Sequence, residues 1–317
     1  MFIDKKYLFL LIGINVDLLY KTNYILNLKY LFRATLIFIS LWEIIGCNSN
    51  TKPVPPAVIT PAIPSYDHVV IVILENKSYE NIIDSTAAPY IKSLANTYAS
   101  FTQSFAIEHP SQPNYLDLYS GSNQGITTDD YLTTRFTTAN LGKQLIGAGK
   151  TFITFSEDLP NAGYDGKIYN RYARKHNPAA NWVGTDSNQI SANTNQPSTA
   201  FPTDFTQLPT VSFVIPNLDN DMHDGSISKG DTWVKNNLDL YVTWAQTHNS
   251  LFILTFDEDD NSDNNHIATI FAGQHIKPGP YTSIINHYTV LRTIEDMYSL
   301  RYAGHAYEAT SITYCWK

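Results

Sequence analysis

Acidic and amide side chains follow apolar runs of this sequence. Glu75 and Asn76 come directly after the run HVVIVIL, and Asp257 and Glu258 come directly after LFILTF. A third apolar run, TVSFVI, is followed a few residues later by Asp219. Carboxylate and amide oxygens bind hard or borderline metal ions, so these positions are candidate metal ligands. The alternative interpretation of each acidic segment is a solvated loop without a ligand.

Ser111 is a candidate nucleophile. It lies between Pro110 and Pro113, whose fixed backbone torsions favour a rigid presentation of its hydroxyl. A helix is predicted to begin next to Ser111, and a helix N-terminus favours a bound phosphate. Proline-rich loops that contain serine are common, so this segment by itself does not identify a nucleophile.

Three histidines lie in or near these segments. His109 is two residues before Ser111, His223 is four residues after Asp219, and His266 begins another apolar run. An aspartate and a histidine four residues apart, just after a strand, can face one site, although they can also mark a turn or a helix N-cap. A single histidine is usually structural or exposed, and His266 is of interest only because it follows the acidic segment.

The elements that must position these residues are predicted from hydrophobic patterning. Short continuous apolar runs rich in β-branched residues predict buried strands of a mostly parallel sheet. The predicted strands are 68–74, 152–155, 210–215, 251–256 and 266–271, and the predicted helices are 233–247 and 290–297. Strands that alternate with helices indicate an α/β fold, whose ligands lie beyond the carboxyl ends of the strands. The polar stretch 176–207 is predicted to be a long surface excursion.

Composition limits the class of protein. The chain has 317 residues, of which 43% are hydrophobic and 13% aromatic, as expected for a globular domain of ordinary size. Residues 47–317 carry 16 Lys/Arg and 26 Asp/Glu, a net charge of −10. No basic cluster that could neutralise phosphates is evident there, so no nucleic-acid partner is expected. A monomer is assumed by default.

The N-terminal segment has the features of a bacterial targeting sequence. Arg33 precedes an apolar run too short to span a bilayer, and the following Ile-Ile-Gly-Cys resembles a lipobox. We therefore predict a lipoprotein-type signal peptide at 1–46, a lipidated Cys47 with a proline-rich tether at 47–65, and one domain at 66–317. The expected location is the bacterial cell envelope, anchored to a membrane by lipid and periplasmic or surface-exposed. The alternatives are a buried or membrane helix, and a disulfide between Cys47 and Cys315.

Four segments taken together resemble a known family. They are HVVIVILENKSYENI, HPSQPNYLDLYSG, IPNLDNDMHDG and LTFDEDD, in this order. The set is similar to the bacterial phosphoesterase family that contains acid phosphatases and phospholipases C. The resemblance runs from about Tyr66 to Tyr298. It implies a three-layer α/β/α fold with a mostly parallel central sheet, similar to that of the alkaline phosphatase superfamily.

The resemblance also implies a role for each candidate residue. Ser111 would be the nucleophile and would touch a divalent metal ion. The other implied metal ligands are Glu75, Asn76, Asp257 and Glu258, with Asp219 as a further candidate. The residues implied to line the phosphate pocket, one of which would protonate the leaving group, are His109, His223 and His266. Alkaline phosphatases use a richer set of His and Asp ligands for two zinc ions, so one ion is expected here, with Ca, Zn, Mg and Fe all open.

The function predicted from the sequence is hydrolysis of phosphate monoesters by an acid phosphatase, through a phosphoserine. One alternative is a phospholipase C or phosphodiesterase that uses the same site. Another, from a different class, is a non-catalytic surface lipoprotein that binds a glycan or a partner. A metal-independent serine hydrolase is disfavoured because the sequence contains no G-x-S-x-G motif.

Overall fold

Apolar β-branched residues form the central strand of the sheet in the computed structural model, which describes residues 63–317. This strand, β1 (His68–Leu74), is buried at every position after the first. It pairs in parallel with β7 (Val211–Ile215) on one side and β8 (Ser250–Phe256) on the other. Burial on both faces explains why the run carries no alternating polar residues.

The sheet is mixed and mostly parallel. Its strands lie in the order β10-β2-β9-β8-β1-β7-β3-β6, and β11 also pairs with β2. The remaining strands are β2 (Ala99–Phe105), β3 (Phe152–Ser156), β6 (Asn195–Pro197), β9 (His266–Gly273), β10 (Gly279–Tyr281) and β11 (Ile285–Asn286). In this described sheet, β9 runs antiparallel to both of its neighbours, β8 and β2. The start of β9 therefore lies at the edge where the parallel strands end.

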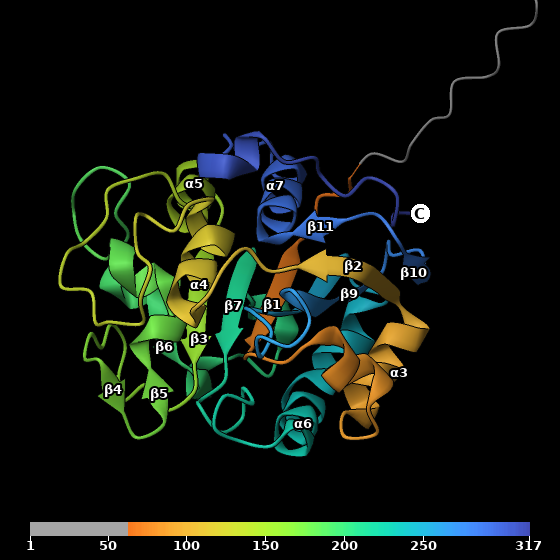
Figure 1. Cartoon of the computed structure of the whole chain (residues 1–317). Helices are drawn as coiled ribbons and strands as arrows, with labels where there is room; N and C mark the ends of the chain where they lie inside the picture. Colours follow the sequence, from red (N-terminus) through yellow and green to blue (C-terminus); the bar gives the residue numbers. More distant parts are fainter. Residues whose placement is uncertain (1–62) are drawn as a thin grey trace, which may run out of the picture. The chain divides into compact units, whose positions relative to one another are not determined.

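Helices cover both faces of the sheet, as Figure 1 shows. Val69, Ile71 and Ile73 of β1 belong to one core, together with residues of α4 (Ser111–Ser120), α5 (Leu141–Gly147) and α7 (His287–Met297). Val70, Val72 and Leu74 belong to the other core, with residues of α3 (Pro89–Thr97) and α6 (Ile227–Ala245). The predicted three-layer α/β/α fold is thus confirmed.

Short elements complete the domain. A π-helical turn, η3 (Glu80–Asp84), follows β1, and β4 (Ile168–Tyr169) forms a two-stranded hairpin with β5 (Tyr172–Ala173). The 3₁₀ turns are η4 (Arg174–His176), η5 (Pro178–Trp182), η6 (Ala192–Thr194), η7 (Ser198–Ala200), η8 (Phe205–Gln207) and η9 (Gly304–Tyr307).

The polar stretch 176–207 differs from its prediction. It was expected to be a surface excursion, but several of its residues are buried. Trp182 is fully buried, and its ring packs against Phe136 at 4.9 Å and Tyr119 at 5.2 Å between centroids. Burial of this ring removes a large apolar area from water and so helps to fix a largely polar segment to the core.

The five predicted strands are all present in the sheet, and both predicted helices begin earlier than expected. Helix α6 begins at Ile227 because Ser226 caps it, with the Ser226 side chain accepting a hydrogen bond from the Lys229 N–H. Strand β2 was missed because Ser100, Thr102, Gln103 and Ser104 interrupt its apolar pattern.

The N-terminal predictions concern residues that the structure does not describe. The signal peptide predicted at 1–46, the lipidated Cys47 and most of the tether at 47–65 lie outside the described residues. Within residues 63–317, none of the helices combines the length and the apolar character needed to cross a bilayer.

Candidate active site

Three carboxylates meet where two neighbouring strands end. Glu75 follows β1, and Asp257 and Glu258 follow β8, which pairs with β1 in parallel. One oxygen from each side chain lies within 4.8 Å of the other two, and all three residues are buried. The sequence predicted this meeting, because parallel neighbours end at the same edge of a sheet.

The hydroxyl of Ser111 lies between two of these carboxylates. Ser111 is the first residue of α4 and is 1% exposed. Its Oγ is 3.0 Å from Glu75 Oε2 and 2.9 Å from Glu258 Oε1. The next residue, Gln112, donates its backbone N–H to Asp129 Oδ1 at 2.9 Å, which ties the start of the helix to the following loop. The hydroxyl is therefore held at the carboxylate cluster, as the resemblance implied for a nucleophile.

The electrostatics of the cluster fit a bound cation. Burial and the neighbouring carboxylates raise the pKa of Glu75 and that of Asp257 well above their ordinary values. Burial also raises the pKa of Glu258, partly offset by hydrogen bonds from His109 and Ser111. Asp257 Oδ2 is buried and has no hydrogen-bond partner within residues 63–317. A divalent cation would satisfy this oxygen and stabilise the ionised carboxylates, and oxygen donors suit a hard or borderline metal.

Asn76 contributes its backbone to the cluster. Its N–H donates to Asp257 Oδ1 at 3.1 Å, and its φ of 28° lies in the left-handed region that asparagine tolerates. Its side-chain oxygen instead accepts a hydrogen bond from Lys77 Nζ at 2.8 Å. The role of the Asn76 side-chain oxygen as a metal ligand therefore stays a prediction. To bind a metal ion, the side chain would have to rotate away from Lys77.

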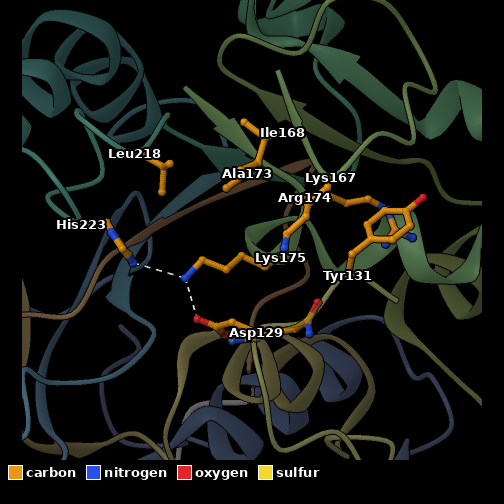
Figure 2. A pocket seen from close by; sticks show the side chains of 10 residues that line it. Asp129, Tyr131, Lys167, Ile168, Ala173, Arg174, Lys175, Leu218 and His223 are labelled. Atoms are coloured by element: carbon orange, nitrogen blue, oxygen red, sulfur yellow. Dashed lines mark hydrogen bonds and ion pairs between the residues drawn. The ribbon is translucent and has the colours of Figure 1, made fainter. Parts of the chain in front are cut away.

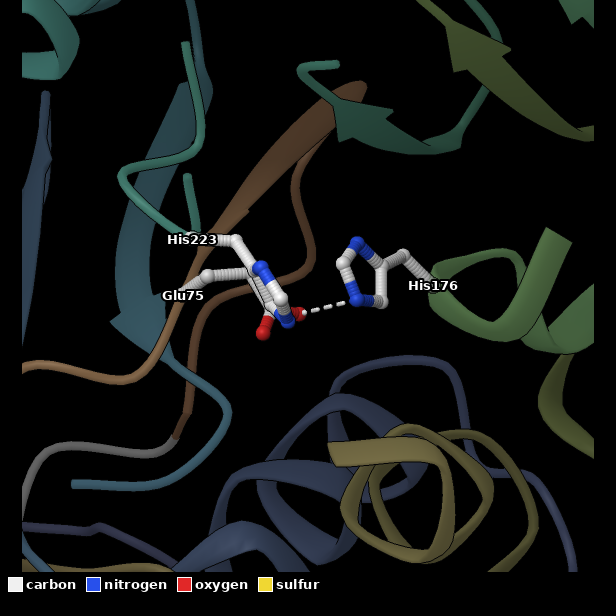
Figure 3. A group of neighbouring side chains, drawn as sticks. All are labelled: Glu75, His176 and His223. Atoms are coloured by element: carbon white, nitrogen blue, oxygen red, sulfur yellow. Dashed lines mark ion pairs between the residues drawn. The ribbon is translucent and has the colours of Figure 1, made fainter. Parts of the chain in front are cut away.

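A second group of candidate metal ligands shares Glu75 and adds His176 and His223, whose ligand atoms all lie within 4.8 Å of one another (Figure 3). His176 Nε2 is 3.0 Å from Glu75 Oε1, and Nδ1 is 3.1 Å from Asp221 Oδ2. Burial, Lys175 and His223 lower the pKa of His176 well below its ordinary value. A neutral imidazole is the form that binds a metal ion.

His176 and Asp221 were not among the predicted site residues. The His176 ring stacks on Tyr115 at 5.2 Å between centroids, and Tyr115 donates its hydroxyl to Glu75 Oε1 at 2.6 Å. His176 lies in the stretch that was expected to be on the surface, where no pattern marked it. Asp221 lies two residues after Asp219, the candidate ligand chosen from this segment. The spacing of the two aspartates from His223 did not show which of them would lie at the site.

Two of the predicted histidines reach the cluster. His109 Nδ1 pairs with Glu258 Oε2, and its Nε2 is 3.4 Å from Asp259 Oδ1. The His109 side chain is 34% exposed, so its ring reaches solvent at the edge of the cluster. His223 Nδ1 is 2.6 Å from Asp224 Oδ1, and its Nε2 is 3.2 Å from Lys175 Nζ.

The structure does not bring His266 to the cluster. His266 Nδ1 is 2.9 Å from Asp263 Oδ2, and Nε2 is 3.1 Å from the Thr102 carbonyl oxygen. Its ring stacks against Tyr79 at 4.6 Å and Phe105 at 5.1 Å between centroids. With both nitrogens engaged and two rings stacked on it, His266 packs the start of β9 instead of lining the pocket predicted for it.

Asp219 also lies apart from both groups of candidate ligands. Its carboxylate pairs with Arg171 at 2.7 Å and with Lys229 at 2.8 Å. The hydrogen bonds from Lys229 and Arg171 lower the pKa of Asp219 below its ordinary value. This carboxylate is already neutralised by two cations, which accounts for its place outside the cluster.

A cavity adjoins the site on the side of His223 (Figure 2). Its volume is 200 Å³, and Gln112, Lys175 and His223 connect it to the residues around Ser111. Lys175 Nζ lies 2.6 Å from Asp129 Oδ2, so this lysine is held between Asp129 and His223. The cavity gives a small molecule a place beside His223 and beside Gln112, the residue that follows Ser111.

The fold and the matches to known proteins together define the class: a hydrolase that acts on phosphoric ester bonds, with an alkaline phosphatase-like fold. The chain belongs to the Phosphoesterase family, whose model matches residues 82–301. It is 46% identical over 257 residues to a phosphatidylinositol-3-phosphatase of Mycobacterium tuberculosis, covering 80% of this chain and 84% of the relative. It is 29% identical over 275 residues to a phosphate-repressible acid phosphatase of Penicillium chrysogenum, covering 83% of this chain and 66% of the relative.

Solved structures support the same fold. The lipoteichoic acid synthase LtaP from Listeria monocytogenes matches with a TM-score of 0.54 at 10% identity, over 80% of this chain and 77% of that one. A protein of the alkaline phosphatase superfamily from Vibrio parahaemolyticus matches with a TM-score of 0.53 at 13% identity. The match covers 75% of this chain and 68% of that one. At these identities the likeness concerns the fold alone.

Proposed function

We propose that the protein is a metal-dependent phosphatase that hydrolyses phosphate monoesters through a phosphoserine at Ser111. The observation that carries the proposal is the position of the Ser111 hydroxyl, within 3.0 Å of Glu75 and Glu258 in a buried carboxylate cluster. Glu75, Asp257 and Glu258 would hold the metal ion. When bound, the ion would supply positive charge to the serine oxygen and to the phosphate oxygens.

The residues around Ser111 supply the remaining steps of the proposed reaction. Ser111 Oγ attacks phosphorus and passes its proton to Glu258 Oε1, the carboxylate oxygen that lies 2.9 Å from it. The bond from phosphorus to the alcohol oxygen breaks, and His109, at the exposed rim of the cluster, protonates that oxygen. Water then attacks the phosphoserine, phosphate leaves, and Ser111 regains a proton.

The natural substrate that we propose is a phosphate monoester of a lipid headgroup. Support comes from the relative at 46% identity, which is named as a phosphatidylinositol-3-phosphatase. The more distant fungal relative is named as an acid phosphatase, which supports a broader set of monoesters and an acidic to neutral optimum. A phosphodiesterase or phospholipase C that uses the same residues is the second candidate.

The proposed location is the bacterial cell envelope, with a lipid on Cys47. Support comes from the apolar run and the Ile-Ile-Gly-Cys sequence that precede the described domain. Incorporation of labelled fatty acid into the full chain, compared with Cys47→Ser, tests this location. Equal labelling of both chains would contradict it.

Hydrolysis of a chromogenic phosphate monoester and the matching diester tests the proposed activity. The assay compares wild type, wild type after chelation, the chelated protein with divalent ions restored, and Ser111→Ala. We expect monoester hydrolysis that chelation abolishes and ions restore, and a loss of kcat/KM of at least about a thousandfold in Ser111→Ala. Ser93→Ala, an exposed serine of α3, is the matched control.

The outcomes separate the candidate functions. Faster hydrolysis of the diester than of the monoester would favour the phosphodiesterase. Activity that survives in Ser111→Ala would rule out Ser111 as the nucleophile. An absence of activity on both esters, without bound metal, would favour a non-catalytic binding protein.

A further inference from the structure

One wall of the cavity beside His223 is the hairpin of β4 and β5. Ile168 pairs with Ala173 across the two strands, and Tyr169 pairs with Tyr172. Residues paired across antiparallel strands share a face, so Ile168 and Ala173 lie together on the face that lines the cavity. Tyr169 and Tyr172 lie on the other face, where both make edge-on contacts with Tyr164 at 5.8 and 6.1 Å between centroids. Tyr164 thus packs against one face of the hairpin, and the apolar side chains of Ile168 and Ala173 on the other face line the cavity.

Tyr131 forms another wall and is held in place by the protein. Its ring lies against the Arg174 guanidinium at 4.9 Å (Figure 2). Its hydroxyl donates to the Asp165 carbonyl oxygen at 2.9 Å. Arg174 is itself fixed by an ion pair with Asp165 at 2.8 Å. Tyr131 is 37% exposed and Ile168 is 54% exposed, so both present apolar surface that no protein group covers. Such surface at the border of a catalytic cluster is suited to the apolar part of a ligand.

The cavity also has a cation without an acidic partner. Lys167, Arg174 and Lys175 all line it. Arg174 pairs with Asp165, and Lys175 pairs with Asp129. Lys167 is exposed, and within residues 63–317 no acidic side chain lies at ion-pair distance from it. An anionic group on a ligand in the cavity would therefore meet Lys167.

We propose that this cavity binds the leaving alcohol of the substrate, and that it selects a ring that places one apolar face against Ile168 and Tyr131 and carries a second anionic group directed at Lys167. The inference rests on the proposed function, because it is the border with the Ser111 cluster at His223 that makes the cavity a leaving-group site. The volume of 200 Å³ is smaller than the roughly 300–1,000 Å³ of pockets that hold drug-sized ligands, which limits the occupant to about one ring.

Hydrolysis of 2-phenylethyl phosphate and ethyl phosphate tests the apolar walls, because both esters release a primary alcohol and differ only in the ring. Ile168→Ser is expected to lower the ratio of kcat/KM for phenylethyl over ethyl phosphate about fivefold, as for the loss of part of an apolar contact. Leu240→Ser is the matched control, since Leu240 is 74% exposed on α6, and it should leave the ratio unchanged.

The second part of the proposal needs an ester with an added anion. We expect wild type to prefer 2-(4-carboxyphenyl)ethyl phosphate over 2-phenylethyl phosphate, and Lys167→Gln to lower this preference about two- to fivefold. Lys235→Gln, which removes an exposed lysine of α6, is the matched control. A preference that is the same in wild type and Lys167→Gln would overturn the assignment of the anion to Lys167.

The outcomes distinguish failure of this inference from failure of the proposed function. Hydrolysis of both simple esters, with a ratio that Ile168→Ser leaves unchanged, would overturn the leaving-group site and leave the phosphatase standing. Failure to hydrolyse any ester would overturn the phosphatase. Binding of 2-phenylethylphosphonate and ethylphosphonate, which cannot be hydrolysed, then tests the cavity by itself. Tighter binding of the phenyl compound, weakened in Ile168→Ser, would support the cavity, and equal affinities would overturn it.

Discussion

Replacing Asp117 with asparagine is expected to stabilise the protein at neutral and alkaline pH. Asp117 lies on α4, six residues after Ser111, and is fully buried. Its Oδ1 accepts a hydrogen bond from the Tyr288 hydroxyl at 2.9 Å, whereas its Oδ2 has no hydrogen-bond partner within the described residues. Burial raises the pKa of Asp117 to about 7, the hydrogen bond from Tyr288 opposes this, and the nearby Glu108 adds to it.

The magnitude follows from the two protonation states. In the folded protein the carboxyl titrates near pH 7, and in the unfolded chain near 3.8. Between these values only the folded state keeps the proton, so the free energy of unfolding falls as the pH rises, and above pH 7 the loss is complete. At about 1.4 kcal/mol for each pH unit, the full loss is about 4 kcal/mol. About 1 kcal/mol of it is already present at pH 4.5.

Urea denaturation at pH 4.5 and pH 8 measures the effect. The free energy of unfolding of Asp117→Asn, minus that of wild type, is expected to increase by about 3 kcal/mol between the two pH values. The carboxylates around Ser111 are present in both proteins, so their titration cancels in this difference. Asp186→Asn, at an exposed position, is the matched control for the loss of a negative charge. An equal difference at both pH values would show that folded Asp117 is already ionised, which would refute the reasoning.

Three further predictions follow from the same structure. Burial raises the pKa of Glu295 to about 8, so wild type loses stability as the pH rises toward 8. The Tm of Glu295→Gln should therefore exceed that of wild type by more at pH 9 than at pH 5.5. An equal gain in Tm at both pH values would contradict this. A divalent ion should raise the Tm of wild type and bind measurably in calorimetric titration, whereas Asp257→Asn should lose both effects, and a retained Tm shift would count against Asp257 as a ligand. Gly121→Ala should lower the free energy of unfolding by at least about 2 kcal/mol in denaturation, because Gly121 has φ +67° and an added Cβ would lie 2.1 Å from the Ala303 oxygen. Gly147→Ala, where an added Cβ meets nothing within 4 Å, is the control, and equal losses in both would contradict the steric argument.

The fold was largely predictable from the apolar runs. β1 and β8 are buried on both faces, so their sequences are continuously apolar and were recognised directly. β2 was missed because polar residues interrupt its apolar pattern. The sheet tolerates one of them, Ser104, because its Oγ forms a buried hydrogen bond with Thr269 Oγ1 at 2.8 Å. The direction of β9 could not be predicted, since an apolar run of this kind is compatible with either orientation.

The site was predictable where its ligands directly follow strands. Glu75, Asp257 and Ser111 meet as expected, because two parallel strands and one helix N-terminus fix their positions. His176 was missed because a 3₁₀ turn far from the strands brings it to Glu75, and only the three-dimensional packing on Tyr115 places it there. Proximity along the chain to the acidic segment suggested a role for His266 that its stacking between two aromatic rings does not support.

The central place of β1 has a consequence for how the chain acquires its structure during synthesis. Val69 pairs with Val211, and His68 pairs with Ser250, so both neighbours of this strand are made long after it. At roughly 5–20 residues per second, a ribosome takes roughly 10–40 s to pass from His68 to Ser250. Both edges of this uncharged, β-branched strand stay unpaired until β7 emerges, and one edge stays unpaired until β8 emerges. A strand of this sequence type is the most prone to pair with other chains. We therefore expect the aggregation risk of this protein to be greatest before β8 emerges, so that slower synthesis or chaperone binding to β1 would change the yield more than small gains in final stability.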